Sequence, residues 1–493
     1  MATVARALRL PAPSRAEALL AAAAFAITAL LAFVGVHKLG TAGVLVPLVA
    51  VVAAIFLTRP VAAVSTVVAL TILCEGKTFG LFTFSTDLYS ELYKYISLLD
   101  LLVALALVSV ALDVMRHRRP LWLPRPLALP LATLALAMVV GVVTGHSNGE
   151  GIRYEVASEH VLAYLLLLPI AVANLDLDRR RMTLLLGGAA GLAIVKAVLG
   201  LIEIAGHYGL AVEGTATLTY YEPPANWLIM ITLFTIFAAL LARHRPPLWM
   251  LATSPLLIAC LLLSYRRSFW IAAALGLLLV WLLGTSSLGR RVLLPAGLAV
   301  AVAIGLLGSI NFQSQLPIVK RAESLAPSKL ESNVQDSYRV DERANVLAEI
   351  AAHPLTGLGV TAPWAATARP LSVEHEGGRE YVHFAALWFW LKLGVLGFLA
   401  YVGVMIGSMV LAWQAWRRSP EPMLRAFGLA SLCGIVGLVV IDTTASFTGV
   451  EARFTVLFAA QLGLLALLSR RASGASAGDS ALQEANSSWT AVV

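Results

Sequence analysis

Apolar runs of about twenty residues recur along almost the whole chain. An α-helix needs roughly 20 mostly apolar residues to cross the hydrocarbon core of a bilayer, so such runs, separated by short polar breaks, indicate successive spans. Hydrophobic residues make up 59% of the sequence and charged residues only 13%, which is more apolar than a soluble protein requires. The sequence therefore predicts an all-α polytopic membrane protein.

We expect about fourteen transmembrane helices, within a range of twelve to fourteen because one run is short and another is long. The runs cover residues 17–36, 41–57, 61–74, 95–112, 126–144, 158–174, 183–204, 225–242, 249–264, 268–284, 292–310, 384–410, 424–441 and 454–469.

The basic residues predict the orientation, since cytoplasmic loops retain Lys and Arg. With the N-terminus inside, each inner segment carries at least one arginine. These arginines are Arg6, Arg9, Arg15, Arg59, Arg116, Arg118, Arg119, Arg125, Arg179 to Arg181, Arg243, Arg245, Arg290, Arg291, Arg417, Arg418, Arg425, Arg470 and Arg471. The pattern predicts both termini in the cytoplasm, and the net charge of +8 is then a topology signal rather than a sign of nucleic-acid binding.

Four regions follow from these runs. Residues 1–310 form an N-terminal transmembrane bundle of about eleven helices, 311–383 a large outer (periplasmic) loop, 384–471 about three further spans, and 472–493 a disordered cytoplasmic tail. Within the loop, residues 338–352 have the pattern of an amphipathic helix with Val340, Leu347 and Ile350 on its apolar face. We expect this helix to lie across the outer mouth of the bundle.

Arg266 and Arg267 break the regular charge pattern, because they form most of an outer break between two spans. Insertion scales put the cost of an arginine at mid-bilayer on the order of 2.5 to 3.5 kcal/mol, and less near an interface. The pair could extend to lipid phosphates at the interface. Alternatively, it could form a dedicated phosphate or pyrophosphate site, since a guanidinium group binds two oxygens at once.

Other ionisable residues in or beside the spans extend the candidate site. Lys196 and Glu203 lie seven residues apart on one helical face, which predicts a polar stripe facing the bundle interior. Lys392 lies two turns into the span that His383 precedes. A histidine there is either a polar cap or a catalytic base, and His353 and His375 of the outer loop compete for the second role.

Three segments of the chain resemble motifs of the bacterial O-antigen ligase and O-antigen polymerase superfamily. Leu262 to Trp270, LLSYRRSFW, is similar to the family's serine and arginine stretch. Arg339, followed by His353 to Gly359, HPLTGLG, resembles its arginine, amphipathic helix and HPLxGxG sequence. His383 to Gly397 resembles its HNxxL and GxxG entry to a late transmembrane helix. The motifs occur in the family's order over roughly residues 225–410.

The resemblance implies a GT-C-like membrane glycosyltransferase that uses a polyprenyl-pyrophosphate-linked glycan as donor. It implies transfer to an acceptor hydroxyl at the outer face of the inner membrane, without a metal or other cofactor. Arg267, assisted by Arg266, would bind the pyrophosphate together with Arg339, and His383 would take the acceptor proton. Phe384 and Lys392 depart from the family pattern, which has asparagine and an acidic residue at these places. Lys392 could add a second cation to the donor site or extend to the interface.

The acceptor stays open, because a lipid, a growing glycan and a protein side chain would all use the same donor chemistry. A transporter or flippase for an anionic or lipid-linked substrate is the alternative, with Lys196, Glu203 and the arginines lining a path. A noncatalytic scaffold of an envelope-glycan complex is a third. The outer loop of about 70 residues favours the transferase, because a transporter has no need of it. Cys74, Cys260 and Cys433 lie in or at the ends of predicted spans, which excludes a disulfide framework and a CxxC metal site.

Overall fold

The structure is a computed structural model that describes residues 46–74, 88–89, 91–93, 95–205, 210–211, 218–219, 222–284, 334–371 and 378–490. Helices make up most of these ranges, and the strands within them form two short antiparallel hairpins. The predicted all-α architecture is confirmed.

The helices in the described ranges are α2 (Val46–Thr58), α3 (Pro60–Leu73), α4 (Leu98–Arg116), α5 (Arg125–Ser147), α6 (Ile152–Ser158), α7 (His160–Ala173), α8 (Arg179–Ala205), α9 (Pro223–Leu241), α10 (Leu248–Leu263), α11 (Arg267–Gly284), α15 (Val334–Ala352), the 3₁₀ turn η3 (Gly378–Glu380), α16 (Ala385–Arg418), α17 (Pro422–Ile441) and α18 (Ala452–Thr490). The hairpins are β1 (Glu91–Tyr93) with β2 (Ile96–Ser97), and β3 (Leu210–Ala211) with β4 (Leu218–Thr219).

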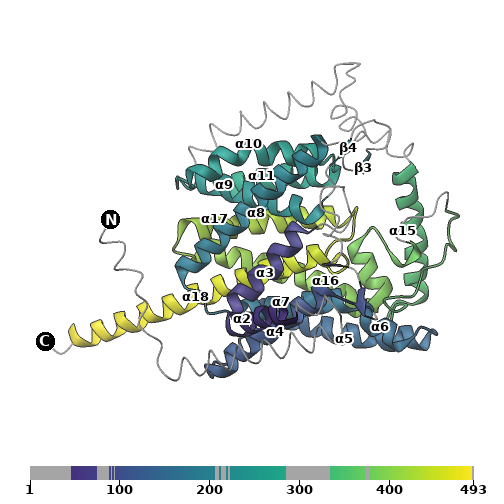
Figure 1. Cartoon of the computed structure of the whole chain (residues 1–493), viewed down its shortest axis with the longest axis horizontal. Helices are drawn as coiled ribbons and strands as arrows, with labels where there is room; N and C mark the ends of the chain where they lie inside the picture. The colour runs from purple at the N-terminus through teal and green to yellow at the C-terminus, as the bar shows by residue number, and fades with distance from the viewer. Residues whose placement is uncertain are drawn as a thin grey trace, which may run out of the picture.

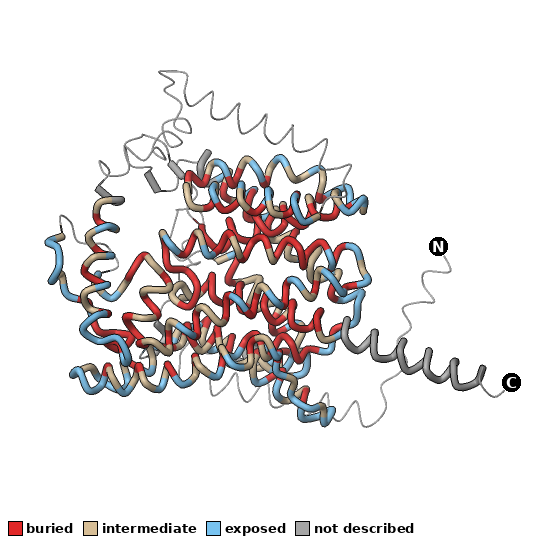
Figure 2. The backbone as a smooth tube through the Cα atoms, turned by 180° about the vertical axis from the view of Figure 1, so that it is seen from behind, coloured by how far each residue is buried: buried red, intermediate tan, exposed pale blue. Residues whose placement is uncertain are grey.

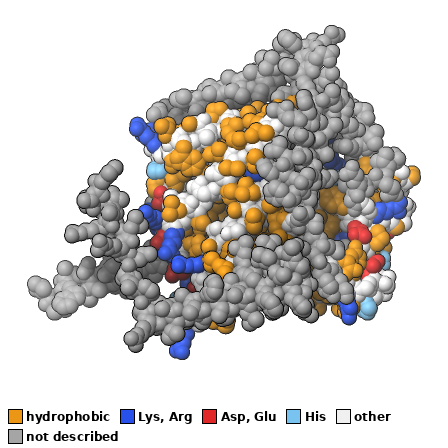
Figure 3. Space-filling model, viewed as in Figure 1, with side chains coloured by type: hydrophobic (Ala, Val, Ile, Leu, Met, Phe, Trp, Pro, Cys, Tyr) orange, Lys and Arg blue, Asp and Glu red, His pale blue; other side chains and the backbone are white. Residues whose placement is uncertain are grey.

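Eight of the described helices are long and apolar enough to cross a membrane, namely α4, α5, α8, α9, α11, α16, α17 and α18. Two bent pairs, α2 with α3 and α6 with α7, raise the number to ten if each pair is one span. Figure 3 shows hydrophobic side chains along the flank of the bundle and charged side chains at its two ends. This distribution is typical of a polytopic membrane protein.

The predicted number of spans is not confirmed. The runs at 17–36 and 292–310 lie outside the described residues. The runs at 41–57 and 61–74 become α2 and α3, of 13 and 14 residues, which meet at 118°. Arg59 between them is non-helical, because the following Pro60 disfavours the helical conformation of the residue before it. Each helix is shorter than the roughly 20 residues of an ordinary span.

The middle of the bundle is formed by α9, α17 and α18, as the buried segments in Figure 2 show. Trp227 of α9 packs its ring against Phe454 and Phe458 of α18, with centroid distances of 5.7 and 6.3 Å. Its indole nitrogen donates to Gln461 Oε1 at 2.9 Å, so the buried polar group is satisfied. These contacts fix α18, the helix that follows the last loop of the site.

One end of the bundle is rich in arginine. The guanidinium carbon of Arg470 in α18 lies 5.4 Å from the ring centroid of Trp122. The backbone carbonyl of Trp122 accepts a hydrogen bond from the side-chain amide of Asn174, which follows α7. Arg471 pairs with Asp176 at 3.6 Å. The last helix, α18, extends beyond this end, whereas α15 lies at the opposite end (Figure 1). The helix predicted over residues 338–352 is therefore present, and it lies at this opposite end of the bundle.

The buried face of α15 differs from the predicted one. Val340 and Leu347 are 55% and 43% exposed, and of the three expected residues only Ile350 is buried. The buried stripe follows helical spacing through Tyr338 and Glu342 to Asn345, Val346 and Ile350. Polar residues occupy this stripe because they bond to neighbouring segments, so the hydrophobic pattern alone selects the wrong face.

The last helix is longer than its span. The sequence predicts a disordered tail over 472–493, but the backbone of α18 is helical through Thr490. Extending a helix that is already formed fixes one residue per hydrogen bond, which costs less than starting a new one.

Candidate active site

The candidate site lies where α15 meets the segment before α16 and the loop between α17 and α18. The backbone N–H of Ala385 donates to the carbonyl of Asp442 at 2.9 Å. Ser446 donates from its hydroxyl to the carbonyl of Val382 at 2.5 Å and from its backbone N–H to the phenol oxygen of Tyr381 at 3.1 Å. These bonds tie two segments about sixty residues apart into one unit.

His383 and Glu342 form a buried pair at the centre of this unit. Glu342 is fully buried on α15, and His383 is 7% exposed. Nδ1 of His383 lies 3.0 Å from Oε2 and 3.1 Å from Oε1 of Glu342, and the backbone N–H of His383 donates to Oε2 at 3.0 Å. A ring nitrogen facing a carboxylate carries the proton, so Nε2 is the basic nitrogen of the neutral ring. The pair thus has the arrangement of a general base with an orienting carboxylate.

Two tyrosines hold the imidazole ring edge-on. The ring centroid of Tyr381 lies 5.0 Å from that of His383 at 82°, and the ring of Tyr338 lies at 5.9 Å and 73°. The indole nitrogen of Trp364 donates to the carbonyl of Tyr381 at 3.1 Å. The ring of His383 is therefore packed from two sides as well as hydrogen-bonded, which fixes its orientation.

Arg266 and Arg339 both act electrostatically on Tyr381. Burial raises the pKa of Tyr381 to about 12, while the positive charges of these arginines and a bond from Ser446 act to lower it. Coulomb effects of this kind require the charges to lie near the phenol. The carbon of the Arg266 guanidinium also lies 6.0 Å from the ring centroid of Phe447. Two half-buried arginines from distant parts of the chain therefore act on the same tyrosine, whose ring packs against that of His383.

A tight turn between α10 and α11 presents Arg266. Tyr265 has a φ of 50°, which is uncommon for a residue with a side chain. The carbonyl of Arg266 accepts the N–H of Trp270 at 3.1 Å, so Arg266 occupies the first cap position of α11. The indole nitrogen of Trp270 donates back to the carbonyl of Leu261 in α10 at 3.1 Å. These hydrogen bonds fix the end of α10 and the start of α11, and Arg266 lies between them.

Asp442 organises the loop from α17 to α18. Its carboxylate accepts the hydroxyl of Tyr401 at 3.0 Å and the backbone N–H of Phe447 at 3.3 Å, while its carbonyl accepts Ala385. Burial raises the pKa of Asp442 to about 6, against hydrogen bonds that favour the charged form. Asp442 therefore positions both Phe447, under Arg266, and the start of α16.

The HPLTGLG segment fills a break in α16. The helix is interrupted at Gly394, where φ is 67° and ψ is −165°. The carbonyls of Leu391 and Lys392, just before this break, accept the N–H groups of Leu358 at 2.8 Å and Gly359 at 3.0 Å. The loop thus supplies the donors that a continuous helix would supply.

The glycines of this segment permit the close approach. A β-carbon on Gly394 would overlap the carbonyl of Leu355, and one on Gly359 would overlap the backbone of Gly145 in α5. Gly357 and Gly359 also have φ of 69° and 98°, which favour glycine. The motif therefore holds together α5, α16 and the segment that follows α15.

Lys392 belongs to this junction. It is fully buried, and its ammonium group donates to the carbonyl of Ala362. Glu155 of α6, also fully buried, accepts the N–H of Val360 at 3.0 Å and that of Thr361 at 3.3 Å. Lys392 therefore holds the segment that follows α15, a contact that neither of the two roles suggested by the sequence includes. Its burial provides no exposed surface for a phosphate.

The remaining predicted residues are not brought to His383 by any described contact. Arg267 is half-buried and begins α11 beside Arg266. Lys196 is buried in α8, a helix that packs against α9, α10 and α3. The side chain of Glu203 and the whole of His375 lie outside the described residues.

Glu342 and Tyr381 are the main residues that sequence reasoning missed. Glu342 lies three residues after Arg339 and four after Tyr338, a spacing that places all three near one face of a helix. This spacing is visible in the sequence, but His383, the residue that Glu342 binds, lies 41 residues away. Tyr381 lies two residues before His383, which carries no signal of its own.

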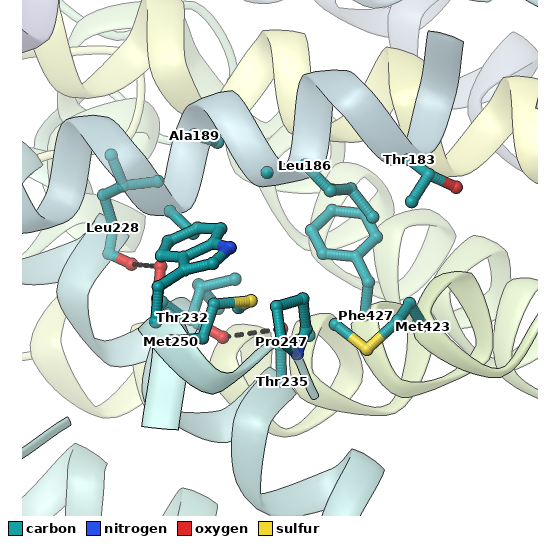
Figure 4. Close-up of a pocket in the computed structure, with 14 residues that line it drawn as sticks. Thr183, Leu186, Ala189, Leu228, Thr232, Thr235, Pro247, Met250, Met423 and Phe427 are labelled. Atoms are coloured by element: carbon teal, nitrogen blue, oxygen red, sulfur yellow. Dashed lines mark hydrogen bonds between the residues drawn. The ribbon is translucent and has the colours of Figure 1, made fainter. Parts of the chain in front are cut away.

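The cavities are separate from this site. The one in Figure 4, of about 90 Å³, lies between α8, α9, α10 and α17 and has no titratable side chain in its lining. The hydroxyls of Thr232 and Thr235 bond to carbonyls of their own helix, at 2.8 Å each. Among the described residues, no group of three His, Cys, Asp or Glu side chains is placed to hold a metal ion.

The fold and site are those of a polytopic membrane protein with a histidine, a carboxylate and two arginines at one end of the bundle. Residues 252–402 match the family model described as O-antigen ligase, which confirms the resemblance to the O-antigen ligase and polymerase family. The matched range contains Arg266, Arg339, Glu342 and His383. Comparison with curated proteins gives no match. The family match supports, in general terms, a membrane protein of glycosyl transfer that acts on a lipid-linked glycan and an acceptor.

Proposed function

We propose that this protein transfers a glycan from a polyprenyl-pyrophosphate donor to an acceptor hydroxyl. The single observation that carries the proposal is the buried pair of His383 and Glu342, beside which Tyr381 lies within the electrostatic influence of Arg266 and Arg339. A base next to two fixed cations suits a reaction in which a hydroxyl loses a proton while a pyrophosphate leaves. The family match over residues 252–402 supports the same class of chemistry.

His383 is the base in this mechanism. Nε2 takes the proton of the acceptor hydroxyl as its oxygen attacks the anomeric carbon, which inverts the configuration there. The Glu342 carboxylate bonds Nδ1, so it holds the correct tautomer and stabilises the imidazolium that forms. General-base catalysis of this kind contributes about 100-fold to 10,000-fold in rate.

The arginines stabilise the leaving group. As the bond from the anomeric carbon to the pyrophosphate oxygen breaks, its electron pair stays on that oxygen, and negative charge grows there. Arg266 and Arg339 are positioned by the α10–α11 turn and by α15 before the reaction begins, so little reorganisation is needed. Arg267 is an additional donor to the same group.

We further propose that the site faces the periplasm at the inner membrane and that the arginine-rich end, with both termini, faces the cytoplasm. This orientation rests on the distribution of arginines along the chain. An undecaprenyl-type pyrophosphate is the expected donor carrier. The acceptor is a lipid core, a growing glycan or a protein side chain.

Transfer by purified protein from a defined polyprenyl-pyrophosphate glycan tests the proposal. His383→Ala should lower the turnover number at least about 100-fold. His353→Ala is the matched control, because His353 is an exposed histidine of the same outer segment. It should retain the parent activity.

Each outcome is informative when all proteins insert and purify alike. Equal activity of His383→Ala and the parent would refute the catalytic assignment. Loss in His353→Ala alone would move the base to that residue. Movement of the donor across vesicles without transfer would favour the transporter, and neither activity in the parent would favour a scaffold.

A further inference from the structure

A second cavity, of about 290 Å³, opens at the arginine-rich end of the bundle. It lies between the last turn of α9, the first turns of α17 and Trp416 near the end of α16. His383 precedes the opposite end of α16, so this cavity is remote from the candidate active site. The proposed glycosyl transfer makes no use of it.

The cavity changes from basic to apolar with depth. Arg243 and Arg425 are exposed and His244 is half-buried, and these three residues lie where the helices end. Ala238 and Leu429 lie one to two turns further into their helices and are each 2% exposed. The lining therefore has a cationic rim and an apolar interior.

The rim has a net positive charge. No Asp or Glu is among the residues that line the cavity. The nearest carboxylate in sequence, that of Glu421, accepts the N–H of Leu424 at 2.6 Å and so caps α17. The side-chain Nε of Arg425 donates to the carbonyl of Ser419 at 3.1 Å, which holds its guanidinium group beside the opening. Arg243 has a φ of 57°, so a left-handed turn sets the direction in which the chain leaves α9.

We propose that this cavity binds an anionic phospholipid, with the headgroup phosphate at Arg243, His244 and Arg425. Paired guanidinium groups bind phosphate oxygens through charged hydrogen bonds, and basic pockets between transmembrane helices are suited to lipid headgroups. The apolar interior distinguishes a lipid from free phosphate, because only a lipid brings an acyl chain to cover Ala238 and Leu429. The site is independent of the proposed catalytic chemistry.

Native mass spectrometry of delipidated protein in detergent tests the proposal. Phosphatidylglycerol is compared with phosphatidylcholine of the same acyl chains, and inorganic phosphate is added as a competitor. The parent should retain one phosphatidylglycerol with at least roughly tenfold preference over phosphatidylcholine. The double variant Arg243→Gln/Arg425→Gln should lose that preference.

A matched control separates the cavity from general surface charge. Arg179→Gln/Arg180→Gln removes two exposed arginines at the start of α8, outside the cavity, and should retain the preference. Ala242→Trp keeps the charges but fills the opening, since Ala242 is exposed and lines it. It should lower phosphatidylglycerol binding roughly tenfold as well.

Three results would overturn the proposal. Equal losses in both double variants would indicate a diffuse surface charge, and normal binding by Ala242→Trp would place the lipid elsewhere. Displacement of phosphatidylglycerol by millimolar inorganic phosphate would show that the rim selects the phosphate alone. All variants are at exposed positions, and unchanged elution and thermal melting establish that they fold.

Discussion

At the scale of single residues, the site depends on how His383 and Arg266 are held. Glu342 bonds His383 by both the ring and the backbone, and Tyr381 connects the histidine with the arginines. Arg266, Glu342 and Tyr381 come from three separate parts of the sequence. Substitutions that keep shape but change charge or tautomer are therefore the sharpest tests.

Replacement of Glu342 by glutamine should lower the turnover number roughly 100-fold or more, with little change in the Michaelis constant for the donor. Glutamine retains the shape but cannot stabilise the imidazolium. Steady-state kinetics with a lipid-linked donor measures this. Asp341→Asn, at the neighbouring carboxylate that pairs with Arg369, is the control and should behave as the parent. Parent-like turnover in Glu342→Gln would reject the role of the carboxylate.

The two adjacent arginines should differ in their contribution. The resemblance to the family favours Arg267, whereas the structure brings Arg266 onto Phe447 and near Tyr381. We expect Arg266→Gln to lower kcat/KM by about 100-fold to 1,000-fold and Arg267→Gln by less than about tenfold. The same donor assay compares them. A larger loss in Arg267→Gln would reverse the assignment.

Asp442 should make stability depend on pH. Burial raises its pKa from 3.8 in the unfolded chain to about 6, so between these values the folded protein holds a proton that the unfolded chain has lost. Its contribution to stability is therefore greatest below about pH 4 and falls as the pH rises to 6, by on the order of 3 kcal/mol.

Thermal melting of Asp442→Asn and of the parent checks this sign. The variant loses a hydrogen bond at every pH, but its melting temperature relative to the parent should rise by a few degrees from pH 4.5 to 7.5. Asp178→Asn, at an exposed aspartate, should show no such trend. A difference that stays constant with pH would contradict the prediction.

At the scale of elements, the junction between the HPLTGLG segment and α16 is the main constraint. Backbone donors of the segment satisfy carbonyls that the break at Gly394 exposes. Lys392 and Glu155 bind the continuation of the segment from either side. The break in α16 and the HPLTGLG motif thus act together to position the chain that leads to Tyr381 and His383.

Gly394→Ala should destabilise the protein by about 2 kcal/mol or more, because φ at this position is 67° and a β-carbon would overlap the backbone of Leu355. Thermal melting in detergent is the readout. Gly187→Ala is the control, since a β-carbon there meets nothing within 4 Å and alanine favours the helix. Equal melting temperatures for Gly394→Ala and the parent would show that the junction tolerates a side chain.

At the scale of the whole molecule, two groups of basic residues lie at opposite ends of the bundle. One end carries the basic cavity and most of the arginines that predict the topology, and the other holds Arg266 and Arg339, the second of which belongs to α15. An apolar flank lies between these two ends (Figure 3).

Cysteine labelling in cells tests this orientation. A cysteine at exposed Ala351 on α15 should react with an impermeant maleimide from the periplasmic side, and one at exposed Arg180 should react only after the membrane is opened. The parent is the background, because Cys260 and Cys433 are buried and Cys74 is half-buried. The reverse pattern would invert the topology and place His383 in the cytoplasm.

Much of the architecture could be predicted from local patterns. Apolar runs located most of the described spans. The pair α2 and α3 could not be assigned in this way, because composition does not show that two short runs meet at 118°. For α15 the period was right and the face was wrong, since Glu342 and Asn345 are buried through bonds rather than hydrophobicity.

The sequence by itself determined that the chain is helical, apolar along its length and resembles the O-antigen ligase family through Arg339, the HPLTGLG segment and His383. These features depend on residue type and on short spacings along the chain, so they can be recognised without the tertiary structure. Only the tertiary structure decided that Glu342 orients His383, that Arg266 lies near Tyr381, and that Lys392 supports the outer segment. Such pairings join residues from 30 to more than 100 positions apart, and the packing of the whole bundle, not any local preference, brings them together.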